Sequence, residues 1–495
     1  MAVTAGLLVF GLYLVVMVAI GLWSGRQQLS AADLWVAGRR FTTPVMVLGL
    51  MAAVMHGGSI LSGVAFAGAF GGVAILPFIS FTVGFLIILV FFARRMREIG
   101  AFTIPDFMAD RYGGVALRAF SALVILCSSV VYLVAQIRGM GLILESLLGL
   151  PFTAAMAVGT ALFVFYVAMG GMLAVMWTNI AQFVFMWVGL AILLPGVYEA
   201  TGGWTNALER ADAVAPGWTS VAGTSWTWTY LLSWWLVWLV AYCTRIELVS
   251  KVFIARDARV ARYAIPTTCL LVMIFLLYGN LYLGAAARVL VWDQIRIPDQ
   301  AFPALASLIL SPVAGAVALT GIASAAMSTT DSLLLLSGAA VAHDLLRKSW
   351  DEPRGHVRSE RTYLLVSRAT IGVIGLVALV AAMQTPQLIL AIVSYAVAMV
   401  GATFFCPLLA GMTWRRANGA GALASAAGGF FTTVTWTALT LAGSAATAGV
   451  HPIVPGLAVS VALLLIVTPL GRPPGRAVLA RYFPDRRHDT AAGAR

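Results

Sequence analysis

Apolar runs of about twenty residues recur along the whole chain and constrain its architecture more than any other feature. Each run is long enough to cross the roughly 30 Å hydrocarbon core of a bilayer as a helix. A chain of 495 residues that is 61% hydrophobic and 10% charged does not have the composition of a water-soluble protein. The sequence therefore predicts an all-α polytopic membrane protein with thirteen transmembrane helices. The runs cover residues 5–24, 44–69, 72–93, 118–148, 152–171, 177–198, 229–250, 264–286, 313–344, 364–384, 387–411, 420–442 and 451–470.

Basic residues are sorted between the predicted loops. One set of alternate loops, together with the C-terminal tail, holds 26 of the 31 Lys and Arg residues, whereas the opposite loops hold only Arg210, Arg288 and Arg296. Cytoplasmic loops carry such an excess of positive charge. We therefore expect an external N-terminus and a cytoplasmic tail in a bacterial cytoplasmic membrane. The same sorting explains the net charge of +12, so a lipid bilayer is the expected partner and nucleic acid is not.

One apolar run, Ala316–Ser337, carries polar residues in its middle. If this run is a helix, one of its faces contains Ser324, Ser328, Asp331 and Ser332. A second, overlapping face contains Ala325, Ser328, Thr329 and Ser332. A carboxylate at membrane depth costs roughly 2.5–3.5 kcal/mol and therefore needs a partner. Hydroxyl, carbonyl and carboxylate oxygens suit a small hard cation. The hydroxyls alone would equally fit a polar helix–helix contact, but the carboxylate favours a cation or proton site.

The second apolar run contains Met55-His56-Gly57-Gly58-Ser59. Two adjacent glycines weaken a helix by roughly 1 kcal/mol each relative to alanine. Local unwinding at this point would free backbone carbonyls to coordinate an ion. Close packing of small residues against a neighbouring helix is the alternative explanation. We expect the unwound helix, because irregular backbone at membrane depth lines cavities.

The second to sixth runs and the seventh to eleventh runs form two sets of five. Because consecutive spans alternate in direction and five is odd, the second set must be inverted relative to the first. This is the arithmetic of an inverted-repeat transporter, inferred here from topology and not from sequence identity between the halves. The expected divisions are a first helix with its inner loop at 1–43, the first repeat at 44–198, an outer loop at 199–228, the second repeat at 229–411, two peripheral helices at 412–470 and a cytoplasmic tail at 471–495.

Six ordered blocks resemble the solute:sodium symporter family over nearly the full length of the chain. They read ILSGVAFAGAFGG, GAFTIPDFMADRYG, YLVAQIRGMGLILESLLGLP, GGMLAVMWTNIAQ, ASAAMSTTDSLLLLSGAAVAHDL and GATFFCPLLAGMTWRRANGAGA. Six blocks in order are far more specific than any single one. The resemblance implies a leucine-transporter-like core of ten helices, coupling to Na⁺ and alternating access.

The resemblance also implies the positions of a sodium site. Carried over to this chain, its ligands are the carbonyls of Met55, Gly58 and Ala325 and the hydroxyls of Ser328 and Thr329. All of these positions lie on the broken run or on the polar run described above.

A second cation site occurs in some members of the family, on the Asp of a Trp-Thr-Asp motif. In this chain the motif reads Trp177-Thr178-Asn179, so an amide replaces the carboxylate. Asp331 and Ser332 supply oxygen ligands on the facing helix, but this pair also occurs in many relatives. Asn179, Asp331 and Ser332 are therefore candidate cation ligands, and a second sodium ion is left open.

The seventh run carries charges where the family usually has small or neutral residues. An Arg245 guanidinium would match a carboxylate, and Glu247 would match an amine or pair with Arg245 or Arg138. Residues i and i+2 do not share a helix face, so a direct Arg245–Glu247 bridge is awkward. An internal charge pair is the structural alternative. The candidate solute contacts are His56, Ser59, Ser62, Gln136, Arg138, Thr244, Arg245, Glu247 and Tyr395.

Together these observations predict a sodium-coupled symporter that imports a small carboxylate-bearing organic solute, either a monocarboxylate or an amino acid. The AQIRGMG and Ala342-His343-Asp344 segments are most similar to the monocarboxylate and acetate permeases of the family. We do not expect an enzyme, because there is no nucleophile–base pair or metal motif. A proton-coupled carrier that uses Asp331 or Glu247 and a solute-sensing membrane receptor remain the alternatives. No obligate protein partner is evident.

Overall fold

The computed structural model describes residues 2–25, 42–55, 57–88, 103–222, 226–245, 258–385 and 388–483. Within these ranges every regular element is a helix, which confirms the all-α prediction. Helices suit this composition because each pairs its own backbone N–H and C=O groups, which lipid cannot do. In chain order the α-helices are α1 (Ala2–Gly25), α3 (Thr43–Val54), α4 (Gly57–Phe70), α5 (Leu76–Ile87), α7 (Ile104–Tyr112), α8 (Val115–Leu148), α9 (Phe152–Thr201), α10 (Trp204–Val214), α11 (Trp228–Thr244), α13 (Ala258–Leu276), α14 (Tyr282–Leu290), α15 (Ala301–Ile309), α16 (Pro312–Ala339), α17 (Glu360–Gln384), α18 (Ile389–Thr413), α19 (Gly419–Leu441), α20 (Ile453–Leu470) and α21 (Arg476–Tyr482).

Nine helices in the described ranges are long and apolar enough to cross a membrane. A pair that bends by 63°, Ser59–Ile75 with Ile79–Ile87, would add a tenth if it forms one span. A helix occupies each of the thirteen predicted runs. However, α11 has only 17 residues and α19 is not among the nine, so the number thirteen stays a prediction.

The long helix α9 consists of two spans joined at a kink. At Gly171 the backbone has φ 59° and ψ −169°, a conformation that is strained for any residue with a Cβ atom. The two parts, 152–171 and 174–201, agree with the separate runs predicted at 152–171 and 177–198. The glycine therefore explains why two predicted spans follow each other without a loop.

Glycines bring α9 and α16 into close contact. A Cβ atom at Gly321 of α16 would lie 2.7 Å from the carbonyl oxygen of Phe185. A Cβ atom at Gly189 of α9 would lie 3.0 Å from both Cα and the carbonyl oxygen of Ala318. Because these neighbours are backbone atoms, neither position has room for a side chain. The close approach places the polar middle of α16 against the second half of α9.

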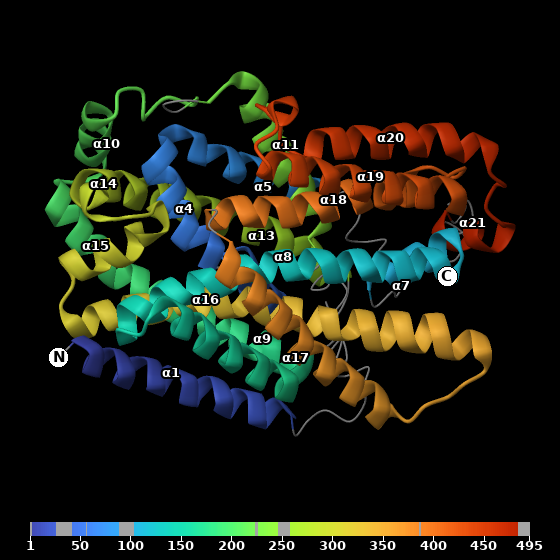
Figure 1. The fold of residues 1–495 in the computed structure, drawn as a ribbon, viewed down its shortest axis with the longest axis horizontal. Coiled ribbons are helices and arrows are strands. Elements are labelled where there is room, and N and C mark those ends of the chain that lie inside the picture. Colours follow the sequence, from blue (N-terminus) through green and yellow to red (C-terminus); the bar gives the residue numbers. More distant parts are fainter. Residues whose placement is uncertain are drawn as a thin grey trace, which may run out of the picture.

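The predicted outer and inner segments lie at opposite ends of the helix bundle (Figure 1). The beginning of α1 lies at the same end as α10, α14 and α15, while α7 and α21 lie at the other end. The short apolar helix α15, too brief to span a membrane, directly precedes α16. Which end faces the cytoplasm is a prediction from the distribution of basic residues.

Candidate functional site

The second predicted run is broken just before the glycine pair, which itself begins the next helix. Helix α3 ends at Val54, Met55 has non-helical φ −86° and ψ 64°, and α4 begins at Gly57. His56, which lies between them, is outside the described residues. The last carbonyl groups of α3 have no N–H partner further along a continuous helix, so they are available to other donors.

The polar middle of α16 meets the end of α3. Ser328 Oγ lies 3.0 Å from the carbonyl oxygen of Ala52 in α3 and 2.8 Å from that of Ala325 in its own helix. Thr329, the next residue, is fully buried, and its Oγ1 has no hydrogen-bond partner among the described residues. The Ser328 hydroxyl thus meets the carbonyl end of α3, and the Thr329 hydroxyl adds a buried oxygen at the next position of α16. These are oxygen ligands of the kind that hard cations prefer.

A second polar group lies further along α16. Gln182 Nε2 of α9 donates to Asp331 Oδ2 at 3.3 Å, while Asp331 Oδ1 has no partner in the described part of the chain. Ser332 Oγ donates to the carbonyl oxygen of Ser328 at 3.3 Å. Asn179 is fully buried on α9, one helical turn before Gln182. The arrangement combines one carboxylate with amide and hydroxyl groups away from water, which suits a bound cation or proton.

Arg245 lies at the C-terminal end of α11 with its guanidinium buried. Its Nη2 donates to Tyr132 Oη at 2.8 Å, and its Cζ lies 5.6 and 5.7 Å from the ring centroids of Tyr132 and Tyr242. Thr244 uses its hydroxyl within α11, donating to the Val240 carbonyl at 2.9 Å. A small cavity beside Arg245 is lined by Ser128, Tyr132, Arg245, Leu333, Ala396, Val397 and Val400. Glu247 lies outside the described residues.

Gln136 and Arg138 of α8 have different environments. Gln136 is 1% exposed, and neither of its amide atoms has a hydrogen-bond partner among the described residues. Arg138 instead donates to the carbonyl oxygen of Ala382 at 3.2 Å and lies over the ring of Phe152. Of these two residues, only Gln136 therefore has a buried polar group with no hydrogen bond to any described residue.

The other candidate solute contacts are spread over two helices. Ser59 lines a cavity beside α4, and Ser62 is buried with no partner for its hydroxyl in the described ranges. Tyr395 of α18 stacks on His451, with ring centroids 5.8 Å apart. The structure thus places Ser59, Ser62 and Tyr395 on α4 and α18, two helices that contact each other.

Asp299 is a buried charged residue that sequence reasoning missed. It lies in a short 3₁₀ turn, Pro298–Gln300, and its Oδ2 accepts the backbone N–H of Ile389 at the start of α18 at 3.1 Å. Burial raises the pKa of Asp299 to about 6, although this N–H group and Arg138 act in the opposite direction. An isolated acidic residue in an outer loop gives no sequence signal of such burial.

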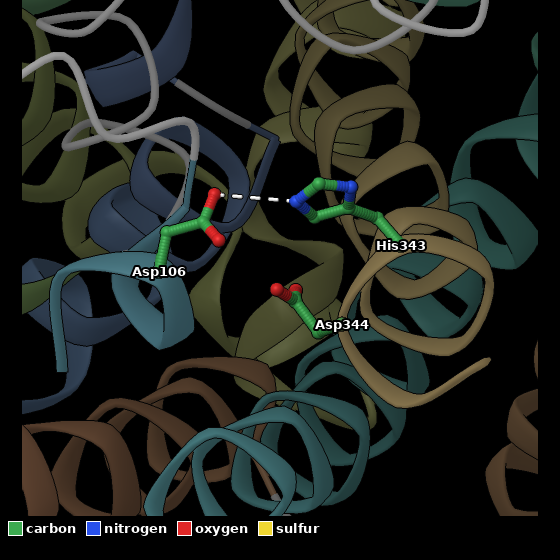
Figure 2. A group of neighbouring side chains, drawn as sticks. All are labelled: Asp106, His343 and Asp344. Atoms are coloured by element: carbon green, nitrogen blue, oxygen red, sulfur yellow. Dashed lines mark hydrogen bonds and ion pairs between the residues drawn. The ribbon is translucent and has the colours of Figure 1, made fainter. Parts of the chain in front are cut away.

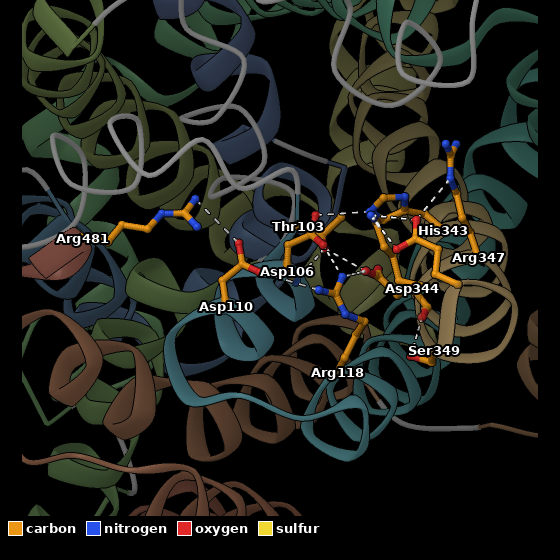
Figure 3. A network of polar contacts seen from close by, with 11 residues as sticks. Thr103, Asp106, Asp110, Arg118, His343, Asp344, Arg347, Ser349 and Arg481 are labelled. Atoms are coloured by element: carbon orange, nitrogen blue, oxygen red, sulfur yellow. Dashed lines mark hydrogen bonds and ion pairs between the residues drawn. The ribbon is translucent and has the colours of Figure 1, made fainter. Parts of the chain in front are cut away.

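A separate polar cluster lies at the end of the bundle that contains α7 (Figure 2). Asp106 of α7 faces His343 and Asp344 of the π-helix η7 (Ala340–Asp351), with one ligand atom of each residue within 4.8 Å of the others. Arg118 of α8 bonds to Asp106, and its Nη1 lies 3.7 Å from Asp344 Oδ1 (Figure 3). Because the Arg118 guanidinium already bonds to one of these carboxylates and lies near the other, we interpret the cluster as a charge network and not as a metal site.

This network anchors α7 to the transmembrane bundle. His343 Nε2 lies 3.3 Å from Asp106 Oδ2, and Thr103 Oγ1 accepts the N–H of Asp106 and donates to Asp344, both at 3.1 Å. Burial raises the pKa of Asp106, but His343 and Arg118 outweigh that effect and lower it to about 2. The sequence contains these segments as family blocks without indicating that they meet in space.

A bundle of apolar helices in which a broken span faces a hydroxyl-bearing helix is an arrangement found in ion-coupled membrane carriers. The sequence profile of the sodium:solute symporter family matches residues 34–429. The chain therefore belongs to this family, and this membership supports sodium as its coupling ion.

Bacterial carriers are similar to the chain over almost their full length. The osmoregulated proline transporter OpuE of Bacillus subtilis (strain 168) is 26% identical over 479 residues, which cover 94% of this chain and 95% of that protein. The sodium/pantothenate symporter of Escherichia coli (strain K12) is 27% identical, covering 92% of this chain and 94% of that protein. The sodium/proline symporter of the same organism is 27% identical, with coverages of 97% and 96%.

The fold is that of a solved sodium-coupled carrier. A structure of a Na⁺-coupled sialic acid symporter in a substrate-bound outward-open state matches with a TM-score of 0.80, at 17% sequence identity. The match covers 95% of this chain and 98% of that one. This similarity supports the leucine-transporter-like arrangement predicted from the sequence.

Proposed function

We propose that the protein imports a small carboxylate-bearing organic solute, a monocarboxylate or an amino acid, together with Na⁺ across a bacterial cytoplasmic membrane. The observation that carries this proposal is the contact between Ser328 of α16 and the Ala52 carbonyl at the end of α3. It brings the hydroxyl-bearing helix to the helix break, so that oxygen ligands from two segments far apart in sequence can share one ion.

In this proposal the carbonyls of Met55, Gly58 and Ala325 and the hydroxyls of Ser328 and Thr329 hold the sodium ion. A bound ion would tie α3 and α4 to α16 and stabilise the conformation that accepts solute. Loss of the ion on the cytoplasmic side would release this tie, and the bundle would change its orientation around the solute site. Asp331, Ser332 and Asn179 are proposed to hold a second cation or to shape the first site.

Arg245 is the proposed contact for the solute carboxylate. A guanidinium forms two parallel hydrogen bonds with a carboxylate, and Arg245 is buried between two tyrosine rings beside a cavity. Proline and pantothenate, which appear in the names of the relatives, both carry a carboxylate. Gln136, with both amide atoms buried and no described partner, is the second proposed contact.

The direct test is uptake into membrane vesicles with an inward sodium gradient. Radiolabelled acetate, pyruvate, proline and pantothenate would each be measured in sodium and in choline medium. We expect at least one compound to accumulate only with sodium, and Arg245→Gln to abolish that accumulation. Uptake that continues undiminished with no sodium on either side would refute sodium coupling.

Proton coupling is a second candidate, favoured by the burial of Asp331 and by its unpartnered Oδ1 among the described residues. A carrier of this kind would accumulate solute after a pH jump in sodium-free vesicles. Asp331→Asn would then remove the response to pH. Under sodium coupling, the pH jump alone would produce no accumulation.

A further inference from the structure

A π turn lies between α13 and α14, and it carries a buried side-chain amide. The turn η4 (Leu277–Leu281) separates α13 from α14, and Asn280 within it is 1% exposed. Single π turns inside α-helices occur frequently at functional sites. Polar residues at membrane depth are also expected to have functional roles. Asn280 therefore needs a specific explanation.

One side of the Asn280 amide is bonded to the broken span. Its Nδ2 donates to the Ser59 carbonyl oxygen of α4 at 2.6 Å. Gly63, one turn later in α4, makes this approach possible, because a Cβ atom at that position would lie 2.7 Å from Asn280 Cγ. The amide is thus held against the same helix that forms the break.

This bond fixes the orientation of the amide. A carbonyl oxygen can only accept, so the NH₂ group must face Ser59 and Oδ1 must face elsewhere. Oδ1 is buried and has no hydrogen-bond partner among the described residues. A buried acceptor without a donor is unfavourable, and a ligand with a donor would remove that cost.

A cavity lies directly beside this amide. It is lined by Ser59, Gly63, Phe66, Ala74, Pro77, Trp238, Tyr242, Leu276, Asn280 and Leu390. Three of these residues, Phe66, Trp238 and Tyr242, are aromatic, and no charged side chain among the described residues lines the cavity. Aromatic faces attract a cation, and a neutral amide oxygen accepts a hydrogen bond from one. The cavity therefore has the chemistry of a site for a protonated amine.

We propose that Asn280 Oδ1 and the aromatic walls of this cavity bind the protonated amine of a zwitterionic solute. This inference rests on the proposed function and narrows it, because a simple monocarboxylate would leave the subsite empty. Tyr242 lies between the two parts of the site, since it lines this cavity and also lies beside the Arg245 guanidinium. An amino acid with its carboxylate at Arg245 would thus direct its amine toward Asn280.

The test compares matched ligands that differ only at the amine. Dissociation constants would be measured with the full-length protein in sodium, by thermal stabilisation, for L-proline, N,N-dimethyl-L-proline and cyclopentanecarboxylate, and for L-alanine and propionate. A hydrogen bond to a charged group contributes roughly 1.5–3 kcal/mol, or about 10–150-fold in affinity. We expect L-proline or L-alanine to bind at least about tenfold more tightly than its analogues without an N–H group.

Variants then assign the preference to Asn280. Asn280→Leu should reduce the ratio to about threefold or less while the sodium-dependent stabilisation remains. Asn206→Leu is the matched control, because Asn206 Nδ2 also donates to a backbone carbonyl, that of Thr201, but lies in α10 outside the cavity. Gly63→Ala keeps the amide and displaces it, so it should also lower the ratio.

The outcomes separate this subsite from the proposed function. Sodium-dependent binding of propionate or cyclopentanecarboxylate as tight as that of the amine-bearing partner would overturn the subsite and leave the sodium symporter standing. Equal binding of N,N-dimethyl-L-proline and L-proline would overturn the hydrogen bond to Asn280. These wild-type comparisons decide the question even if a variant fails to fold. No sodium-dependent binding of any of the five compounds would overturn the subsite, and the proposed function would then be decided by the uptake measurements in sodium and choline medium.

Discussion

Replacing Thr329 by valine should separate ion binding from helix packing. Valine has nearly the same shape and the same branching at Cβ, so it keeps a side chain of similar size at this position of α16. Thr329 Oγ1 makes no hydrogen bond with any described residue, and thus the substitution removes no described protein–protein hydrogen bond. Ser328, by contrast, contacts the carbonyl oxygen of Ala52, so its removal would disturb the structure as well as the proposed site.

The two effects of Thr329→Val have opposite signs. Removing a buried hydroxyl without a partner should stabilise the sodium-free protein by about 1 kcal/mol, at the low end of the cost of such a group. Removing an ion ligand should cost roughly 1.5–3 kcal/mol of sodium binding, which raises the dissociation constant about 10–150-fold. At saturating sodium each tenfold rise removes about 1.4 kcal/mol of ligand-induced stability. The variant should therefore be more stable than the wild type in choline and less stable in sodium.

The assay is thermal unfolding of the detergent-solubilised protein, followed by tryptophan fluorescence during titration with sodium or choline chloride. Thr329→Ser keeps the hydroxyl and should retain sodium binding. Thr330→Val is the neighbouring control, because Thr330 Oγ1 donates to the Ala326 carbonyl at 2.8 Å and its loss should destabilise the protein equally in both salts. A melting temperature for Thr329→Val that shifts by the same amount in sodium and choline would refute the assignment of Thr329 as an ion ligand.

Four further predictions concern the remaining polar groups and the helix packing. Asp331→Asn should raise the sodium concentration needed for half-maximal uptake at least about tenfold; an unchanged value would make Asp331 a bystander. The pKa of Asp299 is raised to about 6 in the folded protein, from about 3.9 when unfolded, so the stability of the wild type should fall as the pH rises from 4 to above 6. Over that range Asp299→Asn should gain up to about 3 kcal/mol relative to the wild type, which a difference in melting temperature would show. Arg118→Gln should destabilise the protein by about 3 kcal/mol in thermal unfolding, since it leaves two buried carboxylates without their guanidinium, and Arg118→Lys should restore part of the loss. Gly321→Ala should destabilise the folded protein by about 1–3 kcal/mol, because the new methyl group meets backbone atoms of α9. Gly372→Ala is the control, since a Cβ atom there has no neighbour within 4 Å, and it should be neutral or stabilising. Equal melting temperatures of the two variants would contradict the close packing of α9 and α16.

The helical architecture can be read from the sequence because its signals are local. Apolar runs follow from bilayer thickness, and a glycine pair weakens a helix wherever it occurs, so the break between α3 and α4 is predictable. The spacing of Ser328 and Thr329 likewise assigns them to overlapping faces of one helix, which is α16. These predictions need only the period of a helix and the cost of polar groups in lipid.

The remaining features depend on which helices meet, and that information is not local. The sequence offers both Arg138 and Arg245 as candidate solute contacts, but only the fold places Arg138 against the end of α17 and Arg245 between two tyrosine rings. Asn280 escapes sequence reasoning because a π turn sets its direction and Gly63 of another helix gives it room. A lone asparagine in an apolar run is nevertheless a usable signal.

The contacts of α16 indicate which side of the proposed ion site moves. On its α9 side, α16 packs backbone against backbone at Gly321, and Ser324 donates to the Gln182 carbonyl at 2.9 Å, so this pair should move as one body. The packing of α16 against α3 is much less extensive than its packing against α9. Here Ser328 donates a hydrogen bond to the Ala52 carbonyl. An interface with so little direct bonding depends on whatever else joins its two sides. A sodium ion bound by oxygens of both helices would supply that link, and its release would free α3 and α4 without separating α16 from α9. Under the proposed function, this asymmetry in packing would let one ion control the rearrangement of the bundle.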